Sequence, residues 1–264
     1  MTSVETITLD LSLYLYETFH YFEDLVSLKT LNDLLIIVPK QRMTNLFENQ
    51  LLTKAAANPN LETLSLLGYD SNLTDEDLER YKKIISSSFI SHLKLSFRLG
   101  KFDHNCGFGL KYFFTSLNTQ RGLKSLKLYL EMESLRCFSI RYMVQGLSKI
   151  PTLTNLNLTL AMYQDHSGFV NALSRYLPAL ENLENLILSL RYFTKTLMYL
   201  DELKASLLKM KRLTSLSLQF IEDFSFIGDA LECLQRKIIK FSNELKTEAE
   251  NKFSVQIDFS GSLY

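Results

Sequence analysis

Hydrophobic and polar positions follow one repeated pattern along this chain. An octad of the form LxxLxLxL recurs nine times, beginning at residues 4, 31, 61, 90, 123, 153, 183, 213 and 252. The match is clearest in the middle, where LKSLKLYL, LTNLNLTL, LENLILSL and LTSLSLQF follow one another at intervals of thirty residues. It weakens toward both ends, as is usual for the terminal units of repeat proteins. A fixed period near thirty residues predicts a solenoid in which each repeat packs against its neighbours.

Each octad predicts a strand with one buried face. In the octad that begins at 153, Leu156, Leu158 and Leu160 alternate with polar residues, which is the pattern of a half-buried strand. Leu153 precedes that strand and is expected to turn into the same core. Between octads the apolar spacing is helical, as in the segment SGFVNALSRYLPAL. We therefore expect one strand and one helix per repeat, with parallel neighbouring strands and right-handed crossovers.

The two ends of the chain differ from the regular middle. The first helical segment, LYLYETFHYFEDLVSL, is dense in Tyr and Phe, which either seal the first repeat or form a docking surface. Residues 222–264 are expected to form a C-terminal cap, with a charged helix from Phe224 to about Glu248 and a final strand, FSVQIDF. Because the repeats continue without a break, we expect residues 1–264 to form a single domain.

Composition narrows the classes of partner. A chain of 264 residues that are 46% hydrophobic can bury a large core. The chain has 29 Lys and Arg residues and 29 Asp and Glu residues, so it has no net charge that would attract nucleic acid or an anionic membrane. Every apolar stretch is shorter than the about 20 continuous residues of a membrane span, and we expect no membrane contact. Three isolated cysteines and an N-terminus without a targeting pattern predict an intracellular, cytoplasmic protein.

Candidate chemistry is sparse. The four histidines fall in different repeats without a repeated acidic or nucleophilic companion, so we expect no catalysis. The irregular fourth repeat holds Asp103, His104 and Cys106, but a metal site needs a spaced second pair of ligands. In the same segment, Gly107 and Gly109 lack the Lys and Ser or Thr of a phosphate-binding loop. We therefore predict neither a bound metal nor a cofactor.

The octads resemble the strand signature of leucine-rich repeat proteins over nearly the whole chain, and the repeat length is most similar to the intracellular, ribonuclease-inhibitor-like branch. The resemblance implies an α/β solenoid of about nine repeats of about 30 residues, a curved right-handed superhelix with a parallel sheet on its concave side and helices on its convex side. The family has Asn or Cys at position nine of the repeat. Here that position holds Tyr69, Arg98, Glu131, Ala161, Arg191 and Ile221, which predicts a longer strand and a different turn.

The resemblance also implies a solvated concave face built from the outward strand positions five and seven and the position-nine residues. Lys94 and Lys127 share one column on neighbouring strands and, with nearby basic residues, form a basic patch. This patch either anchors acidic side chains or a phosphate group of a partner, or consists of solvated lysines offset by Glu131. Tyr129 beside Leu67, with Ile187 further along, is a candidate aromatic and apolar anchor. The candidate partner-binding residues are Leu67, Lys94, Ser96, Arg98, Lys127, Tyr129, Asn157, Thr159, Ile187 and Arg191.

These features favour a non-catalytic protein-interaction module or a scaffold subunit of a multiprotein complex, which binds a protein partner with an acidic patch through the concave face. Nucleic acid is disfavoured as a partner. The alternative is a regulator of a nucleotide-hydrolysing enzyme, because some leucine-rich repeat proteins stimulate a GTPase. In that role Arg98 or Arg191 would stabilise the catalytic elements of the GTPase.

Overall fold

The computed structural model describes residues 4–11, 20–38, 45–72, 81–82, 90–99, 113–117, 122–132, 137–162, 167–191, 199–224 and 229–263. Nine strands in these ranges form one sheet, in which the spatial order of the strands is their order in the sequence. All eight neighbouring pairs are parallel. The strands are β1 (Thr6–Asp10), β2 (Asp33–Val38), β3 (Thr63–Asn72), β4 (His92–Leu99), β5 (Ser125–Met132), β6 (Asn155–Met162), β7 (Asn185–Arg191), β8 (Ser215–Phe224) and β9 (Ser254–Leu263).

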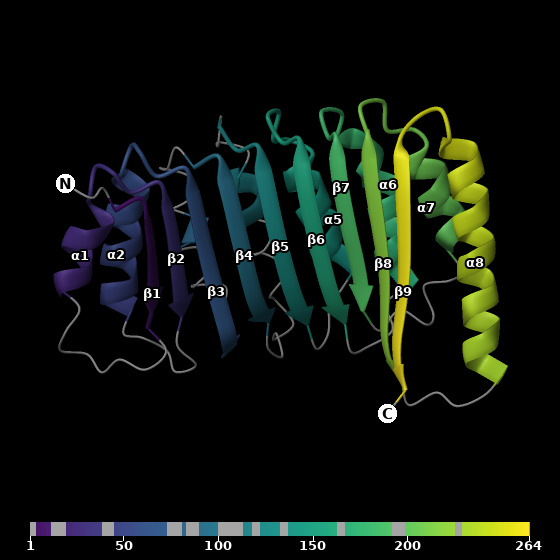
Figure 1. The fold of residues 1–264 in the computed structure, drawn as a ribbon, viewed down its shortest axis with the longest axis horizontal. Helices are drawn as coiled ribbons and strands as arrows, with labels where there is room; N and C mark the ends of the chain where they lie inside the picture. Colours follow the sequence, from purple (N-terminus) through teal and green to yellow (C-terminus); the bar gives the residue numbers. More distant parts are fainter. Residues whose placement is uncertain are drawn as a thin grey trace.

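Helices connect successive strands. They are α1 (His20–Val26), α2 (Asn45–Ala57), α5 (Cys137–Leu147), α6 (Ser167–Tyr176), which continues into the 3-10 turn Leu177–Ala179, α7 (Leu200–Leu207) and α8 (Asp229–Ala249). Figure 1 shows α5, α6 and α7 behind the sheet and α8 beside β9. The α/β architecture and the single parallel sheet predicted from the octads are thus confirmed. Among the described helices, none is long and apolar enough to cross a membrane.

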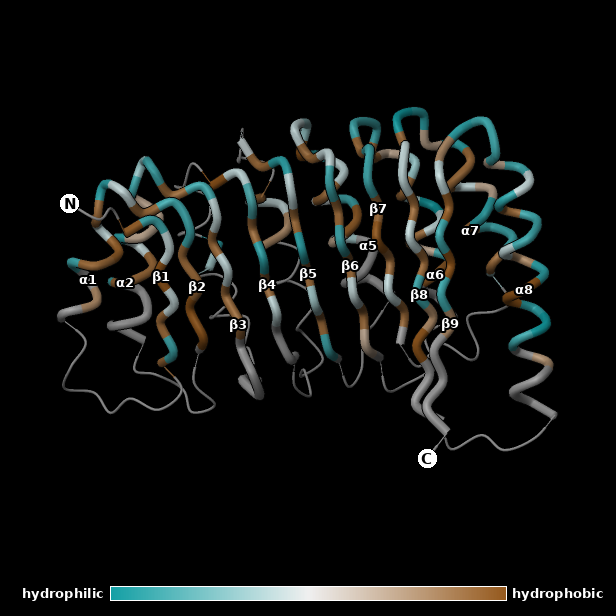
Figure 2. The backbone as a smooth tube through the Cα atoms, in the orientation of Figure 1, coloured by the Kyte–Doolittle hydropathy of each residue, from teal (hydrophilic) through white to brown (hydrophobic). Residues whose placement is uncertain are grey.

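Every strand begins at the third residue of its octad, which fixes the direction of all later side chains. The fourth, sixth and eighth residues then point to one side, as with the buried Leu126, Leu128 and Leu130 of β5. Figure 2 shows the resulting alternation of hydrophobic and hydrophilic positions along the strands. The first octad residue, such as Leu123 or Leu153, is also buried, as predicted. These leucines join into one hydrophobic core that continues from repeat to repeat.

A ladder of backbone hydrogen bonds joins the repeats where the chain enters each strand. The carbonyl oxygen of Lys124 accepts from the N–H groups of Thr154 and Asn155 in the next repeat, both at 3.0 Å. The carbonyl of Thr154 accepts in the same way from Glu184 and Asn185, at 2.8 and 3.0 Å. Threonine hydroxyls strengthen this ladder, since Thr154 Oγ1 also donates to the Lys124 carbonyl at 3.2 Å. The repeats are therefore joined before the strand, and position nine can remain part of the strand.

The strands are as long as the residues at position nine predict. β5 and β6 have eight residues, whereas β3, β8 and β9 have ten, so that position nine lies within each of these strands. The expected helix start at Phe224 is wrong, because Phe224 is the last residue of β8 and pairs with Leu263 of β9. The C-terminal helix begins instead at Asp229. The predicted final strand is confirmed as β9, the last strand of the sheet.

An ionic contact joins the C-terminal helix α8 to the preceding helix α7. Lys204 Nζ of α7 donates to Glu244 Oε2 at 2.8 Å and to Glu248 Oε1 at 2.9 Å, both on α8. The hydrogen bonds that Lys204 donates to these two carboxylates raise its pKa above the usual range of a lysine. The same contact with Lys204 lowers the pKa of Glu244. The contact between α7 and α8 is therefore sensitive to pH.

Candidate binding surface on the open sheet face

The outward side chains at octad positions three, five and seven form the sheet face that we call the open face. In the position-five row, Lys94 of β4 lies opposite Lys127 of β5, and Lys127 lies opposite Asn157 of β6. Asn157 in turn lies opposite Ile187 of β7. Four of the candidate residues therefore occupy consecutive places in a single row, which crosses four strands.

The position-seven row contains four of the candidate residues on β3 to β6 but no charged side chain among them. Leu67, Ser96, Tyr129 and Thr159 follow one another across β3 to β6, and all four are half-buried. Tyr129 does not lie directly beside Leu67 as expected, because Ser96 of β4 separates them, and Ile187 lies further along in the position-five row. The Tyr129 hydroxyl donates to Glu131 Oε2 at a long 3.4 Å. Tyr129 is therefore engaged with its own strand.

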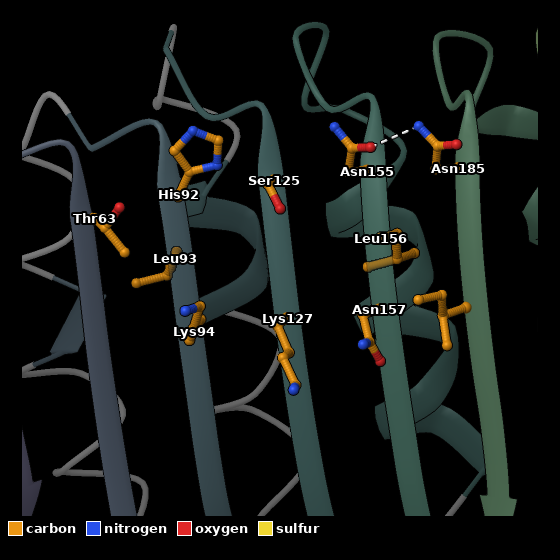
Figure 3. Close-up of a pocket in the computed structure, with 11 residues that line it drawn as sticks. Thr63, His92, Leu93, Lys94, Ser125, Lys127, Asn155, Leu156, Asn157 and Asn185 are labelled. Carbon is orange, nitrogen blue, oxygen red and sulfur yellow. Dashed lines mark hydrogen bonds between the residues drawn. The ribbon is translucent and has the colours of Figure 1, made fainter. Parts of the chain in front are cut away.

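A hollow of about 380 Å³ lies on the open face where β3 to β7 begin. Most of the lining side chains stand at positions three and five, Leu93 and Leu156 stand at position four, and all of them come from β3 to β7 (Figure 3). The described lining residues include two lysines and several hydroxyl and amide groups and no carboxylate. The lining residues are Thr63, His92, Leu93, Lys94, Ser125, Lys127, Asn155, Leu156, Asn157, Asn185 and Ile187.

The two lysines at one end of the hollow are both exposed and directly opposite each other. Like charges facing across neighbouring strands are unfavourable. Within the described part of the chain, neither Lys94 nor Lys127 forms an ion pair. Glu131 therefore does not offset Lys127 by a direct contact, and the exposed, unpaired lysines fit both the anion anchor and the solvated pair. This end of the hollow carries uncompensated positive charge.

Amides characterise the other end of the hollow. Asn185 Nδ2 donates to Asn155 Oδ1 at 2.7 Å across β6 and β7, and Asn155 Nδ2 donates to Thr154 Oγ1 at 2.9 Å. In the described residues, the side-chain amide of Asn157 has no hydrogen-bond partner. A carboxamide offers both a donor and an acceptor, as does a peptide group. This end of the hollow is suited to main-chain contacts, with the half-buried Ile187 as an apolar neighbour.

Beyond the hollow, outward polar side chains bind one another. Ser189 Oγ donates to Gln219 Oε1 at 2.7 Å, and Gln256 Nε2 donates to Asp258 Oδ2 at 2.9 Å. The expectation that small outward residues are solvated is wrong at two positions, since Ser65 is 7% exposed and Ser189 is 3% exposed. Both hydroxymethyl groups lie between longer side chains of the neighbouring strands, which cover them. These side chains are therefore engaged within the sheet or covered by it.

Some candidate residues contribute no described side chain. Arg98 and Arg191 lie in the position-nine row, opposite Glu131 and Ile221 respectively, but their side chains lie outside the described part of the structure. Asp103, His104 and Cys106 lie in segment 100–112, which is also outside the described residues. In the ranges that are described, no group of three or more His, Cys, Asp or Glu residues could hold a metal ion.

Position three was missed by the sequence pattern. His92, Ser125, Asn155 and Asn185 line the hollow, but only positions five and seven were expected to point outward. The alternation of side chains along a strand could have indicated position three, because a residue two places before an outward residue points to the same side if the strand has already begun.

Comparison of the sequence with models of known protein families and with curated proteins gave no match.

Proposed function

We propose that this chain is a divergent leucine-rich repeat solenoid that binds a protein partner through its open face, the concave face of such a solenoid. It acts as a non-catalytic interaction module or as a subunit of a larger assembly. The observation that carries this proposal is the hollow, in which Lys94 and Lys127 face each other without an ion-pair partner in the described residues.

Two further features support a protein partner with an acidic patch. Fixed like charges attract an oppositely charged surface, which speeds association and selects among partners. The side chains of the hollow stand on paired parallel strands, and a rigid support of this kind reduces the entropy lost when a partner is bound. The alternative role, regulation of a nucleotide-hydrolysing enzyme, depends on Arg98 and Arg191, and no observation on their side chains favours it.

Site-specific photo-crosslinking tests the proposal. A photoreactive residue is placed at Asn157 on the open face and, as a control, at the exposed Lys209 between α7 and β8. The proposal predicts one recurrent protein crosslinked from Asn157 and not from Lys209. That protein is identified by mass spectrometry and purified for binding measurements with the intact chain.

Substitutions then locate the binding surface. The triple variant Lys94→Glu, Lys127→Glu and Tyr129→Ala is expected to weaken binding by about tenfold or more, because it reverses the charge of the hollow. The control variant Lys209→Glu with Lys211→Glu changes two exposed lysines between α7 and β8, outside the lining of the hollow, and should bind as the unchanged chain does. Equal affinities of the triple variant and the unchanged chain would show that the partner does not use the open face.

A further inference from the structure

We infer that the hollow binds an extended, phosphorylated segment of the protein partner, with the phosphoryl group between Lys94 and Lys127 and an apolar side chain four residues away over Ile187. The inference rests on the proposed function and specifies the chemistry that this surface recognises. Three properties of the hollow carry it: its direction across the strands, the charge at one end, and the separation of its two ends.

The hollow runs across the strands. Its outward side chains stand in two rows, positions three and five, which lie about 6.6 Å apart along a strand, and the buried Leu93 and Leu156 of position four lie between these rows. Across the sheet the lining extends from Thr63 on β3 to Asn185 on β7, four strand intervals of about 4.8 Å, or about 19 Å. An extended segment that fills the hollow therefore lies across β3 to β7.

The charged end matches a phosphoryl group better than a single carboxylate. A phosphoserine or phosphothreonine carries a charge of about −1.5 to −2 at neutral pH, which balances the two lysines, whereas a carboxylate balances one. A phosphoryl group has three acceptor oxygens. Three donor groups stand in consecutive places of the row: the ammonium groups of Lys94 and Lys127 and the side-chain amide of Asn157. Figure 3 shows these three side chains on adjacent strands.

The distance to the apolar end sets the spacing in the bound segment. From the midpoint between Lys94 and Lys127 to Ile187 there are two and a half strand intervals, which amount to about 12 Å. In an extended chain, side chains on one side recur every second residue, at separations of about 7 Å and about 13 Å. The apolar residue that meets Ile187 is therefore four residues from the phosphorylated one. The amide of Asn155 on β6 lies between these two points, the amide of Asn185 lies on β7 with Ile187, and both adjoin the main chain of the segment.

Fluorescence anisotropy with short alanine-based peptides tests the inference on the full chain. One peptide carries phosphoserine with leucine four residues later, and a second carries the leucine four residues earlier. Matched peptides replace phosphoserine by serine or by glutamate, or move the leucine to the second residue. We expect one of the first two peptides to bind most tightly and its serine version to bind at least about tenfold more weakly.

Variants of the chain assign the preference to the hollow. Lys94→Ala with Lys127→Ala should remove the preference for phosphoserine over serine, while Lys209→Ala with Lys211→Ala should keep it. Equal binding of the phosphoserine, glutamate and serine peptides would overturn the inference. A glutamate peptide as tight as the phosphoserine peptide would overturn it in favour of an acidic segment. Unchanged binding on moving the leucine would overturn the assigned spacing.

A separate measurement keeps this inference distinct from the proposed function. The partner captured from Asn157 is treated with phosphatase, and its affinity for the chain is compared before and after treatment. A decrease of about tenfold or more supports the inference. If the untreated and treated partner bind equally and both depend on Lys94 and Lys127, the open face binds protein but does not recognise phosphate.

Discussion

The side chain of Asn58, buried against the neighbouring repeat, is fully hydrogen-bonded, whereas those of Lys94, Lys127 and Asn157 in the hollow of the open face have no partner in the described residues. Asn58, at the end of α2, is 6% exposed, and its Nδ2 donates to the carbonyls of Val26 and Leu28 in the preceding repeat at 3.1 and 3.0 Å. Lys94 and Lys127 are exposed and, in the described residues, have no ion-pair partner. Asn58 thus holds two repeats together, while the two lysines are available for a partner.

Measurements of stability and of partner binding should therefore respond to substitutions in different regions of the molecule. Substitutions on the packed side should change the free energy of unfolding, because they leave buried groups without partners or force atoms together. Substitutions in the hollow should change binding and leave the unfolding free energy within about 0.5 kcal/mol, as is usual for exposed positions.

The largest change in stability is expected for Asn58→Leu. Leucine is similar in size but cannot donate to the Val26 and Leu28 carbonyls or accept from the Asn60 N–H, which donates to Asn58 Oδ1 at 3.0 Å. We expect the free energy of unfolding, measured by urea denaturation, to fall by about 2–4 kcal/mol. The matched substitution on the open face, Asn157→Leu, should change stability by less than about 0.5 kcal/mol. Equal effects of the two substitutions would remove the distinction between the two regions.

The next largest effect is expected for Gly146→Ala in α5. A Cβ atom at this position would lie 2.6 Å from Phe114 Cβ and 2.7 Å from the Phe114 carbonyl oxygen. Because backbone cannot move aside as a flexible side chain can, overpacking should outweigh the better helix propensity of alanine and cost about 2 kcal/mol. Urea unfolding with Gln145→Ala as the neighbouring control measures this. A stabilising Gly146→Ala would mean that the two segments are less closely packed.

A smaller effect of opposite sign is expected for Ser174→Ala. The Ser174 hydroxyl of α6 is buried and has no hydrogen-bond partner in the described structure, while its backbone carbonyl accepts from the Ser206 hydroxyl of α7. Removal of the hydroxyl keeps that backbone contact and should stabilise the fold by up to about 1 kcal/mol. Ser206→Ala, which removes the donor, should destabilise it. Destabilisation by both substitutions would show that the Ser174 hydroxyl is hydrogen-bonded.

A still smaller effect is expected for the pH dependence of the contact between α7 and α8. Because the folded state lowers the pKa of Glu244 below its ordinary value of 4.5, this carboxylate stabilises the fold above that pH. Its contribution is lost as the pH falls through the lowered pKa. Glu244→Gln should therefore reduce the melting temperature by about one or two degrees at neutral pH and by less in acid. A decrease that is the same at both pH values would contradict the role of the carboxylate charge.

The sequence was sufficient to predict the repeats, the parallel sheet and the inward leucines, because each depends on a local spacing. The same period-two rule places Leu126, Leu128 and Leu130 in the core wherever the strand begins. The start of α8 was not predictable in this way. Phe224 extends β8 because Leu263 of β9 pairs with it, and that partner lies far along the chain.

The candidate surface was only partly predictable for the same reason. The row of Lys94, Lys127, Asn157 and Ile187 follows directly from the repeat register. The contribution of position three depends on where each strand begins, and the burial of Ser65 and Ser189 depends on the length of side chains in neighbouring repeats. Such neighbour effects are properties of the assembled sheet and cannot be read from one octad.

The most direct test combines stability and binding in one variant, Lys94→Ala with Lys127→Ala. Removal of two opposed like charges should leave the free energy of unfolding unchanged or raised by less than about 0.5 kcal/mol. The affinity for the protein partner crosslinked from Asn157 should fall by about tenfold or more in the same variant. A variant that keeps its affinity for this partner would contradict the assignment of the hollow as the binding site.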